Sequence, residues 1–302
     1  MLLQANMIKR ITASGGGDLE ARSGESLVVR RIECRPSTND SYLTISVDRV
    51  TVAFWRVQGK SGNHLGTIYK DSIKYNLMEF LADIGINVSI PIAEGQVLTV
   101  KRYAETGNVI LVYDRYTAGD IKADMPNGSA AKIYNFIQYA KVGSTPTASG
   151  DALIDTSLTP AEFPDFPCGR VVPALHKIKL LGIVGCPFLC ATAGVRGFAT
   201  KFLKLVKNRE VLFDTDRNGI PFDAEEPTVT TTGYRTMFSL IGSYVGYPSA
   251  TYVAANKPLI FDPPLNFESG EELNAYLVLA KLDTAAWVAD IDDQAFILQV
   301  QR

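Results

Sequence analysis

Histidine is nearly absent from this sequence, whose 302 residues include only His64 and His176. Imidazole is the usual base near neutral pH, so most mechanisms that need one are excluded, together with multi-histidine metal sites. The sequence also lacks the G-x-S-x-G, Walker and H-E-x-x-H patterns. A hydrolase with two carboxylates drawn from distant parts of the chain stays open, but no pair of acids is singled out. The sequence is therefore poor in catalytic residue types.

Long apolar runs and an excess of one charge are missing as well. The stretch from Ile178 to Leu189 is interrupted by Lys, Gly and Pro, and falls short of the roughly 20 residues that span a bilayer. Lys and Arg number 30 against 32 Asp and Glu, which argues against a protein that mainly neutralises nucleic-acid phosphates. The start, Met1 to Ile11, places its apolar cluster before its basic residues, the reverse of a secretory signal, and predicts no export by the general secretory route.

Cysteine is too scarce for a disulfide scaffold, since the chain has four. A zinc site drawn from Cys168, His176, Cys186 and Cys190 matches none of the familiar ligand spacings. We expect reduced and mostly buried thiols.

Strand signals dominate what is present. Short runs rich in Val, Ile, Thr, Tyr and Phe alternate with Gly, Pro, Asn and Asp. Leu27–Cys34 is one such run, and Tyr42–Trp55 is another, with a turn predicted near Asp48-Arg49. Val97–Val100 and Val109–Tyr113 flank a turn-like segment and predict a hairpin.

The two halves of the chain echo one another. In the first half, Val47–Phe54 precedes a loop, a short helical pattern from Asp71 to Ala82, and Pro91–Leu98. In the second half, Val206–Phe213 precedes a longer loop, a helical pattern around Arg235 to Ile241, and Pro264–Leu273. Chance similarity between β-rich segments is the alternative. The pattern predicts an all-β fold of two tandem jelly-roll β-sandwiches with a few short helices.

A segment rich in Gly, Ser, Thr and Pro separates the halves. We expect an N-terminal jelly roll over 1–124, a helix and interdomain linker over 125–167, and a C-terminal jelly roll over 168–302. Within the linker, Ser129 to Val142 places apolar residues at helical spacing and predicts a packing helix. The alternative is a final strand of the first domain.

One metal-binding pattern is complete. Residues 214–225 fit the calcium-loop form D-x-[DN]-x-[DN]-G-x5-E, with candidate ligands Asp214, Asp216, Asn218, Ile220 through its carbonyl, and Glu225. Pro227 and the β-branched run after it stand where a calcium-binding loop continues into a helix. The alternative is a β-turn with solvated acids. A calcium-dependent carbohydrate-binding β-sandwich protein, a spike or lectin, is the second functional hypothesis.

The tandem pattern, carried by the two strand-loop-helix-strand modules and especially by Pro91–Leu98 and Pro264–Leu273, resembles the double jelly-roll major capsid proteins of tailless, membrane-containing icosahedral viruses, including compact bacteriophage members. The resemblance covers nearly the whole chain and rests on architecture. It implies a structural virion protein without catalytic residues or a certain cofactor, Ca²⁺ being the candidate ion. It also implies a homotrimer forming pseudo-hexagonal capsomers over an internal membrane.

The partners that the resemblance implies are other copies of the chain, neighbouring capsomers, penton or minor capsid proteins, and membrane lipids. Sequence-specific nucleic-acid binding is not expected. The implied location is the virion capsid, after synthesis in the host cytoplasm. The apolar and basic start, with Leu2, Leu3, Met7, Ile8, Lys9 and Arg10, is a candidate for lipid contact, and an ordinary first strand or a frayed terminus is the alternative.

Overall fold

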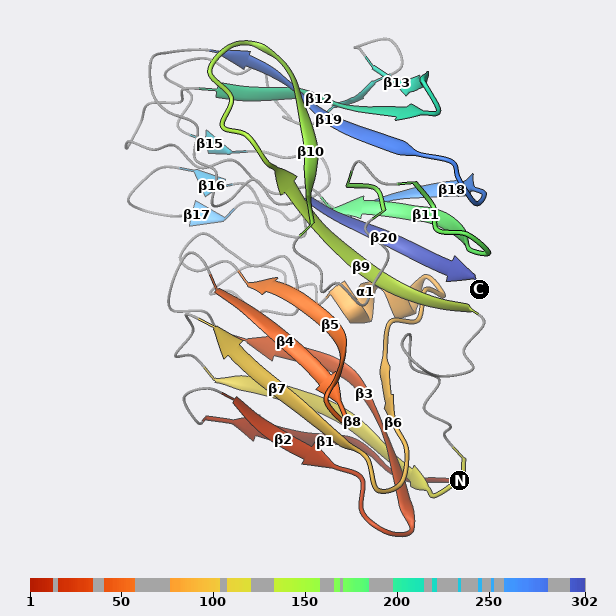
Figure 1. Ribbon diagram of the computed structural model, residues 1–302. Coiled ribbons are helices and arrows are strands. Elements are labelled where there is room, and N and C mark those ends of the chain that lie inside the picture. The colour runs from red at the N-terminus through yellow and green to blue at the C-terminus, as the bar shows by residue number, and fades with distance from the viewer. Residues whose placement is uncertain are drawn as a thin grey trace. The chain divides into compact units, whose positions relative to one another are not determined.

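A computed structural model describes most of the chain (Figure 1). The described residues are 1–12, 16–34, 41–57, 77–103, 108–120, 133–157, 166–168, 171–184, 198–214, 219–221, 233–234, 244–245, 251–252, 258–281 and 294–301. The chain divides into two compact units, one of Met1–Lys70, Lys74–Ile137 and Val300–Arg302, the other of Asp71–Ile73 and Gln138–Gln299. The strands are antiparallel throughout the described sheets: two separate four-stranded sheets are formed by the first eight strands, and one continuous nine-stranded sheet contains most of the later strands.

The first unit contains strands β1 to β8 and the helix α1. The bounds are β1 Leu2–Ile11, β2 Gly16–Glu20, β3 Glu25–Cys34, β4 Ser41–Val47, β5 Val50–Val57, α1 Leu77–Asp83, β6 Ile90–Ile92, β7 Val97–Tyr103 and β8 Val109–Thr117. One sheet has the order β1-β8-β3-β6 and the other β2-β7-β4-β5. Each strand is thus followed along the chain by a strand of the other sheet, except that β4 and β5 form a hairpin within one sheet. This is the topology of a jelly roll.

A second set of eight strands repeats this topology. They are β9 Ile133–Val142, β10 Gly150–Ser157, β11 Lys177–Val184, β12 Phe198–Lys207, β13 Glu210–Phe213, β18 Leu259–Phe267, β19 Leu273–Lys281 and β20 Gln294–Gln301. Their order is β13-β12-β19-β10 followed by β9-β20-β11-β18, and β9 and β10 pair with each other. The predicted all-β fold of two tandem jelly rolls is confirmed. We call β1–β8 the first roll and these eight strands the second roll.

The strands of the two rolls correspond one to one along the chain. Strands β1 to β5 match β9 to β13, and β6 to β8 match β18 to β20. The insertions between the fifth and sixth strands differ: the first roll has α1, whereas the second has the two-residue strands β14 Ile220–Pro221, β15 Gly233–Tyr234, β16 Tyr244–Val245 and β17 Thr251–Tyr252. The helix expected over residues 71–82 is confirmed where it is described. The pattern around Arg235 to Ile241 lies outside the described residues.

Each roll encloses an aliphatic core. The core forms because alternate residues of each strand point inward, as strand β19 shows. Its alternate residues are buried and the residues between them are more exposed; the buried ones are Leu273, Ala275, Leu277 and Leu279. In the first roll, buried side chains from both sheets include Leu27, Val29, Leu43, Ile45, Leu98, Val100 and Leu111. In the second roll, Phe166 packs on Phe267 with ring centroids 4.9 Å apart.

The helix predicted over Ser129 to Val142 is wrong, because Ile133–Val142 forms strand β9. Phe136, Ile137, Gln138 and Ala140 are all buried, so residues on both faces of this strand avoid water. A strand buried on both faces loses the alternation that identifies strands and resembles a helix in its periodicity. The segment 125–167, expected as helix and linker, therefore contributes β9 and β10 to the second roll.

The predicted hairpin of Val97–Val100 with Val109–Tyr113 is also wrong. Both segments are strands, but β7 pairs with β2 and β4, whereas β8 pairs with β1 and β3. The chain crosses from one sheet to the other between them. The turn predicted at Asp48-Arg49 is confirmed, and both residues have positive φ, 48° and 72°, as a type I′ hairpin turn requires.

Candidate functional site

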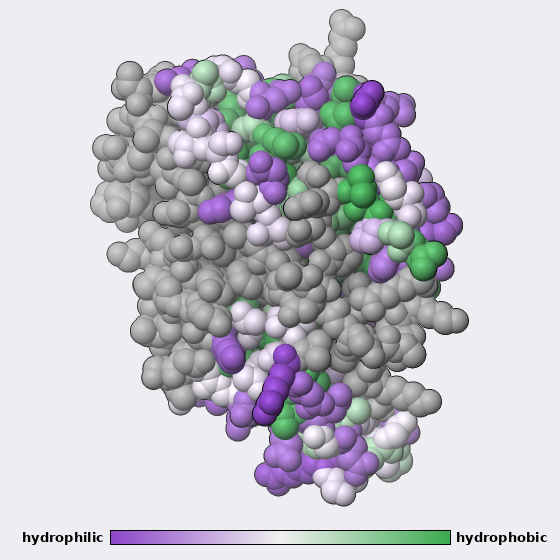
Figure 2. Space-filling model, viewed as in Figure 1, coloured by the Kyte–Doolittle hydropathy of each residue, from purple (hydrophilic) through white to green (hydrophobic). Residues whose placement is uncertain are grey.

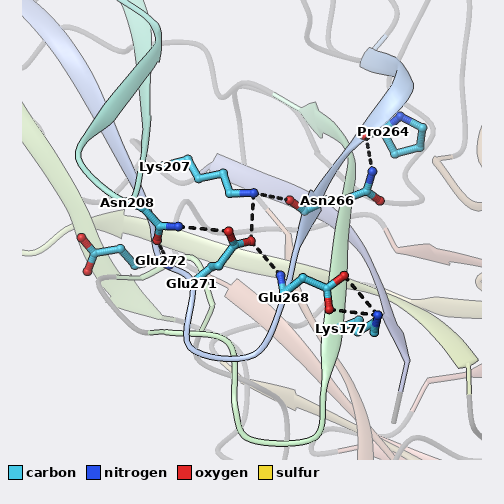
Figure 3. Close-up of polar contacts among 8 residues, drawn as sticks. All are labelled: Lys177, Lys207, Asn208, Pro264, Asn266, Glu268, Glu271 and Glu272. Carbon is cyan, nitrogen blue, oxygen red and sulfur yellow. Dashed lines mark hydrogen bonds and ion pairs between the residues drawn. The ribbon is translucent and has the colours of Figure 1, made fainter.

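Three short turns lie together in each roll, one directly before its third strand and the others between its fourth and fifth and its sixth and seventh strands. In the second roll they are formed by residues 172–176, 208–209 and 268–271, and we call this region the short-turn end of that roll. Hydrogen bonds connect the turns to each other: Val172 N donates to Glu271 O at 2.8 Å, and Asn208 N donates to Glu272 O at 3.3 Å. The side chains here form the polar network in Figure 3.

The turn from Glu268 to Glu271 is shaped by its own sequence. Gly270 has φ 83°, which glycine adopts without steric cost, and Glu271 N donates to Glu268 O at 3.0 Å. The Glu271 carboxylate folds back and accepts a 2.8 Å hydrogen bond from Glu268 N. A side chain three residues on thus satisfies the first amide of the turn.

The Asn208 side chain connects the hairpin turn at residues 208–209 to the residues directly before strand β19. Its Oδ1 accepts from Glu272 N at 2.9 Å, and its Nδ2 donates to Glu271 Oε1 at 3.0 Å (Figure 3). Asn tolerates the positive φ of 47° found at this position better than most residues. One side chain therefore both allows the turn and fixes it to its neighbour.

Lys207 supplies the positive charge at the centre of this network. Its Nζ lies 2.8 Å from Glu271 Oε2 and donates to Asn266 O at 2.9 Å (Figure 3). Burial alone would raise the pKa of Glu271, but hydrogen bonds from Lys207 and from Glu268 N outweigh that effect and hold the pKa below its ordinary value. The carboxylate is therefore ionised and paired at neutral pH.

A second ion pair lies on the outer side of the same turn. Lys177 Nζ contacts both carboxylate oxygens of Glu268, at 3.0 and 3.1 Å, and both side chains are 60% exposed (Figure 3). Exposed pairs of this kind contribute little to stability because water and salt screen them. Their effect is on surface charge, since each Lys in Figure 3 faces a Glu.

The remaining turn of this end is apolar. Residues Val171 to Leu175 are five successive apolar residues, of which Val171, Ala174 and Leu175 are exposed. His176 N donates to Pro173 O at 3.1 Å and closes the turn, and Leu175 has φ 65°. Sequence reasoning missed this turn. The signal that finds it is the alignment of the two halves, which places Leu175 opposite Gly24.

The calcium candidates are only partly described. Asp214 and Ile220 are described, whereas Asp216, Asn218 and Glu225 lie outside the described residues. Ile220 is in β14, paired with Leu203 of β12, and its side chain is buried. The calcium loop therefore stays a prediction.

The Asp214 carboxylate shares a lysine with another acid. Lys204 Nζ lies 2.9 Å from Asp151 Oδ2 and 3.5 Å from Asp214 Oδ1. The hydrogen bond to Asp151 is the main reason that the pKa of Lys204 is raised. Asp214 thus already faces a cation, which a bound calcium ion would have to compete with or accommodate.

The described residues of the zinc candidate do not form a cluster. Cys168 is buried and accepts a 3.6 Å hydrogen bond from Gln138 Nε2, and His176 Nδ1 lies 2.8 Å from Ala174 O. Cys186 and Cys190 lie outside the described residues. Among the residues that the structure describes, no group of three or more His, Cys, Asp and Glu side chains is placed to hold a metal ion. No described helix is long and apolar enough to cross a membrane.

Figure 2 shows a described surface in which hydrophilic residues predominate and hydrophobic ones form small separate patches on the face drawn. Comparison of the chain with models of known protein families found no match, and neither did a search of curated proteins.

Proposed function

We propose that this chain is a structural virion protein, the major capsid protein of an icosahedral shell. The observation that carries the proposal is the strand-for-strand duplication of a jelly roll within one chain. Three copies of such a chain supply six similar rolls, which is the number that a pseudo-hexagonal capsomer needs. Closed rotational symmetry of identical subunits is the usual form of protein assembly.

The composition supports this role. A net charge of −2 spread over 302 residues allows many copies to pack closely without strong mutual repulsion. The proposed protein is not an enzyme, in keeping with its two histidines and the absence of nucleophile and nucleotide motifs from its sequence. Its proposed partners are other copies of itself, neighbouring capsomers, penton or minor capsid proteins, and the lipids of an internal membrane. Its proposed location is the virion.

The test is the mass of the purified protein in solution, measured by light scattering. The proposal expects a stable species of three times 32.9 kDa that grows into larger shells as concentration rises. Repeating the measurement with calcium and with a chelator tests the candidate loop at residues 214–225, because an assembly site there would make the trimer or shell dependent on calcium. A strictly monomeric protein at high concentration contradicts the proposal.

A further inference from the structure

The turn formed by Val171 to Leu175 differs in character from its counterpart in the first roll. Matching hydrogen bonds align the two turns: Gly95 N donates to Ala21 O at 2.8 Å, and Gly270 N donates to Val172 O at 3.0 Å. Val171–Leu175 thus corresponds to Glu20–Gly24. The first roll places Glu, Arg, Ser and Gly around Ala21, whereas the second places only Val, Pro, Ala and Leu.

The backbone makes Leu175 unusual. Its φ is 65°, and the side chain is 91% exposed, whereas Gly24 at the corresponding position has φ 82°. A bulky residue at positive φ carries steric strain that glycine avoids. Leu175 is so exposed that it gains almost no packing within its own chain to offset that strain.

The size and charge of this turn and its neighbours limit the class of partner that it could bind. The exposed apolar residues of the turn, Val171, Ala174 and Leu175, are few and aliphatic. The core of a protein interface typically spans a larger area and is enriched in aromatic residues. The charges of the neighbouring turn are paired, Lys177 with Glu268 and Lys207 with Glu271 (Figure 3). A small exposed apolar tip beside these two ion pairs matches a lipid layer whose headgroups carry both signs.

We propose that the turn Val171–Leu175 inserts into the surface of a zwitterionic lipid bilayer, with Leu175 as its tip. The ion pairs of the short-turn end then lie at the level of the headgroups. One turn buries little apolar surface, so each copy binds weakly, and joining several turns in one oligomer raises the overall affinity. This inference rests on the proposed capsid function, which already names membrane lipids as partners, and adds the residues that contact them.

The experiment uses the purified full-length protein, as the oligomer it forms, and sucrose-loaded vesicles of phosphatidylcholine at millimolar lipid. Leu175→Gly is the test variant, because glycine accepts the backbone angle and the fold loses almost no packing. Ile84→Ser is the control, since Ile84 is an exposed apolar residue, 44% exposed, that directly follows α1 and lies outside the short-turn end of the second roll. We expect the wild type and Ile84→Ser to sediment with the vesicles, and Leu175→Gly to show a partition coefficient lower by about tenfold.

Because the nearby charges are paired, adding phosphatidylglycerol or raising the salt concentration is expected to change binding little. The proposal is overturned if the wild type does not sediment with phosphatidylcholine vesicles, if Leu175→Gly binds as well as the wild type, or if binding needs anionic lipid. A fall in the oligomer mass of Leu175→Gly without a lipid effect also overturns it, and assigns the turn to a contact between protein copies. Lipid binding by a wild type that is monomeric in light scattering supports the lipid site and contradicts the capsid function instead.

Discussion

The short-turn ends of the two rolls use the same hydrogen bonds with different side chains. In the first roll, Val97 N donates to Asp48 Oδ1 at 3.0 Å, and in the second, Glu272 N donates to Asn208 Oδ1 at 2.9 Å. Ala93 N donates to Gln96 Oε1 at 2.9 Å, just as Glu268 N donates to Glu271 Oε2 at 2.8 Å. The shared bonds belong to the jelly-roll framework, and the differences mark what each roll has added.

Two of the differences at these matched positions change the character of the turns most. Glu271 replaces the neutral Gln96 and gains Lys207 as an ion-pair partner. Leu175 replaces Gly24 and keeps its positive φ. The first difference adjusts the charge of the short-turn end, and the second introduces a strained apolar tip. The framework therefore explains why the turns of the two rolls share one backbone arrangement.

The largest effect on stability is expected at matched core positions of the two rolls. Leu98 and Leu273 are both fully buried and directly follow the residues that bond to the hairpin turns. Replacing either by Ala is expected to reduce the free energy of unfolding of its own roll by about 2 to 5 kcal/mol, because a cavity is left in the core. Hydrogen exchange should show loss of protection in the mutated roll. Equal loss in both rolls for either variant would show that the rolls do not unfold as separate units.

The next test concerns the hairpin-turn residues. Asp48→Ala and Asn208→Ala each remove an acceptor for a strand amide and a residue suited to positive φ, which costs about 1 to 2 kcal/mol of stability. We expect the larger loss at Asn208, since its Nδ2 also donates to Glu271. Denaturant unfolding of the two variants measures the difference. A larger loss at Asp48 would contradict the importance given to the Asn208 network.

Exchanging the turn residues tests the strain at Leu175. Gly24→Leu is expected to destabilise the protein by about 1 kcal/mol, because nothing within 4 Å of the added Cβ clashes and only the backbone angle is unfavourable. Leu175→Gly is expected to stabilise by less, since glycine also increases the entropy of the unfolded chain. Thermal unfolding of both variants provides the measurement. Destabilisation by Leu175→Gly would mean that leucine packs within the chain and is not a strained tip.

The smallest effect is the pH dependence of the Glu271 pair. The folded-state pKa of Glu271 is lowered, so its contribution is fully present above the ordinary carboxylate range and is lost as pH falls through the lowered value. We expect Glu271→Gln, which restores the residue type of the first roll, to be slightly less stable than the wild type at pH 7. The stability difference should shrink under acid conditions. A difference that is independent of pH would show that the charge of Glu271 has no role.

Local patterns predicted the fold where one face of a strand is buried. The alternation in β4 and the turn at Asp48-Arg49 identified a hairpin, and the repeat of that module at Val206–Phe213 indicated the duplication. Strand β9 was predicted as a helix because burial of both faces removes the alternation. The pairing of β7 and β8 was mistaken because neighbours in sequence belong to different sheets, which only the whole topology determines.

The surface features were harder to predict than the fold. Glu271 and Lys207 are ordinary charged residues in the sequence. They form a network of polar contacts only because the fold brings the turns close together. Leu175 looks like one more apolar residue until its backbone angle and exposure are known. Residues Asp216, Asn218 and Glu225 of the calcium pattern lie outside the described residues, so that hypothesis is tested by binding experiments.

The most direct test of the capsid proposal is electron microscopy of the largest species in a purified sample. The proposal predicts particles with threefold symmetry and a nearly hexagonal outline, produced by six similar rolls from three chains, together with shells built from them. Isolated particles of single-chain size at every concentration would contradict it.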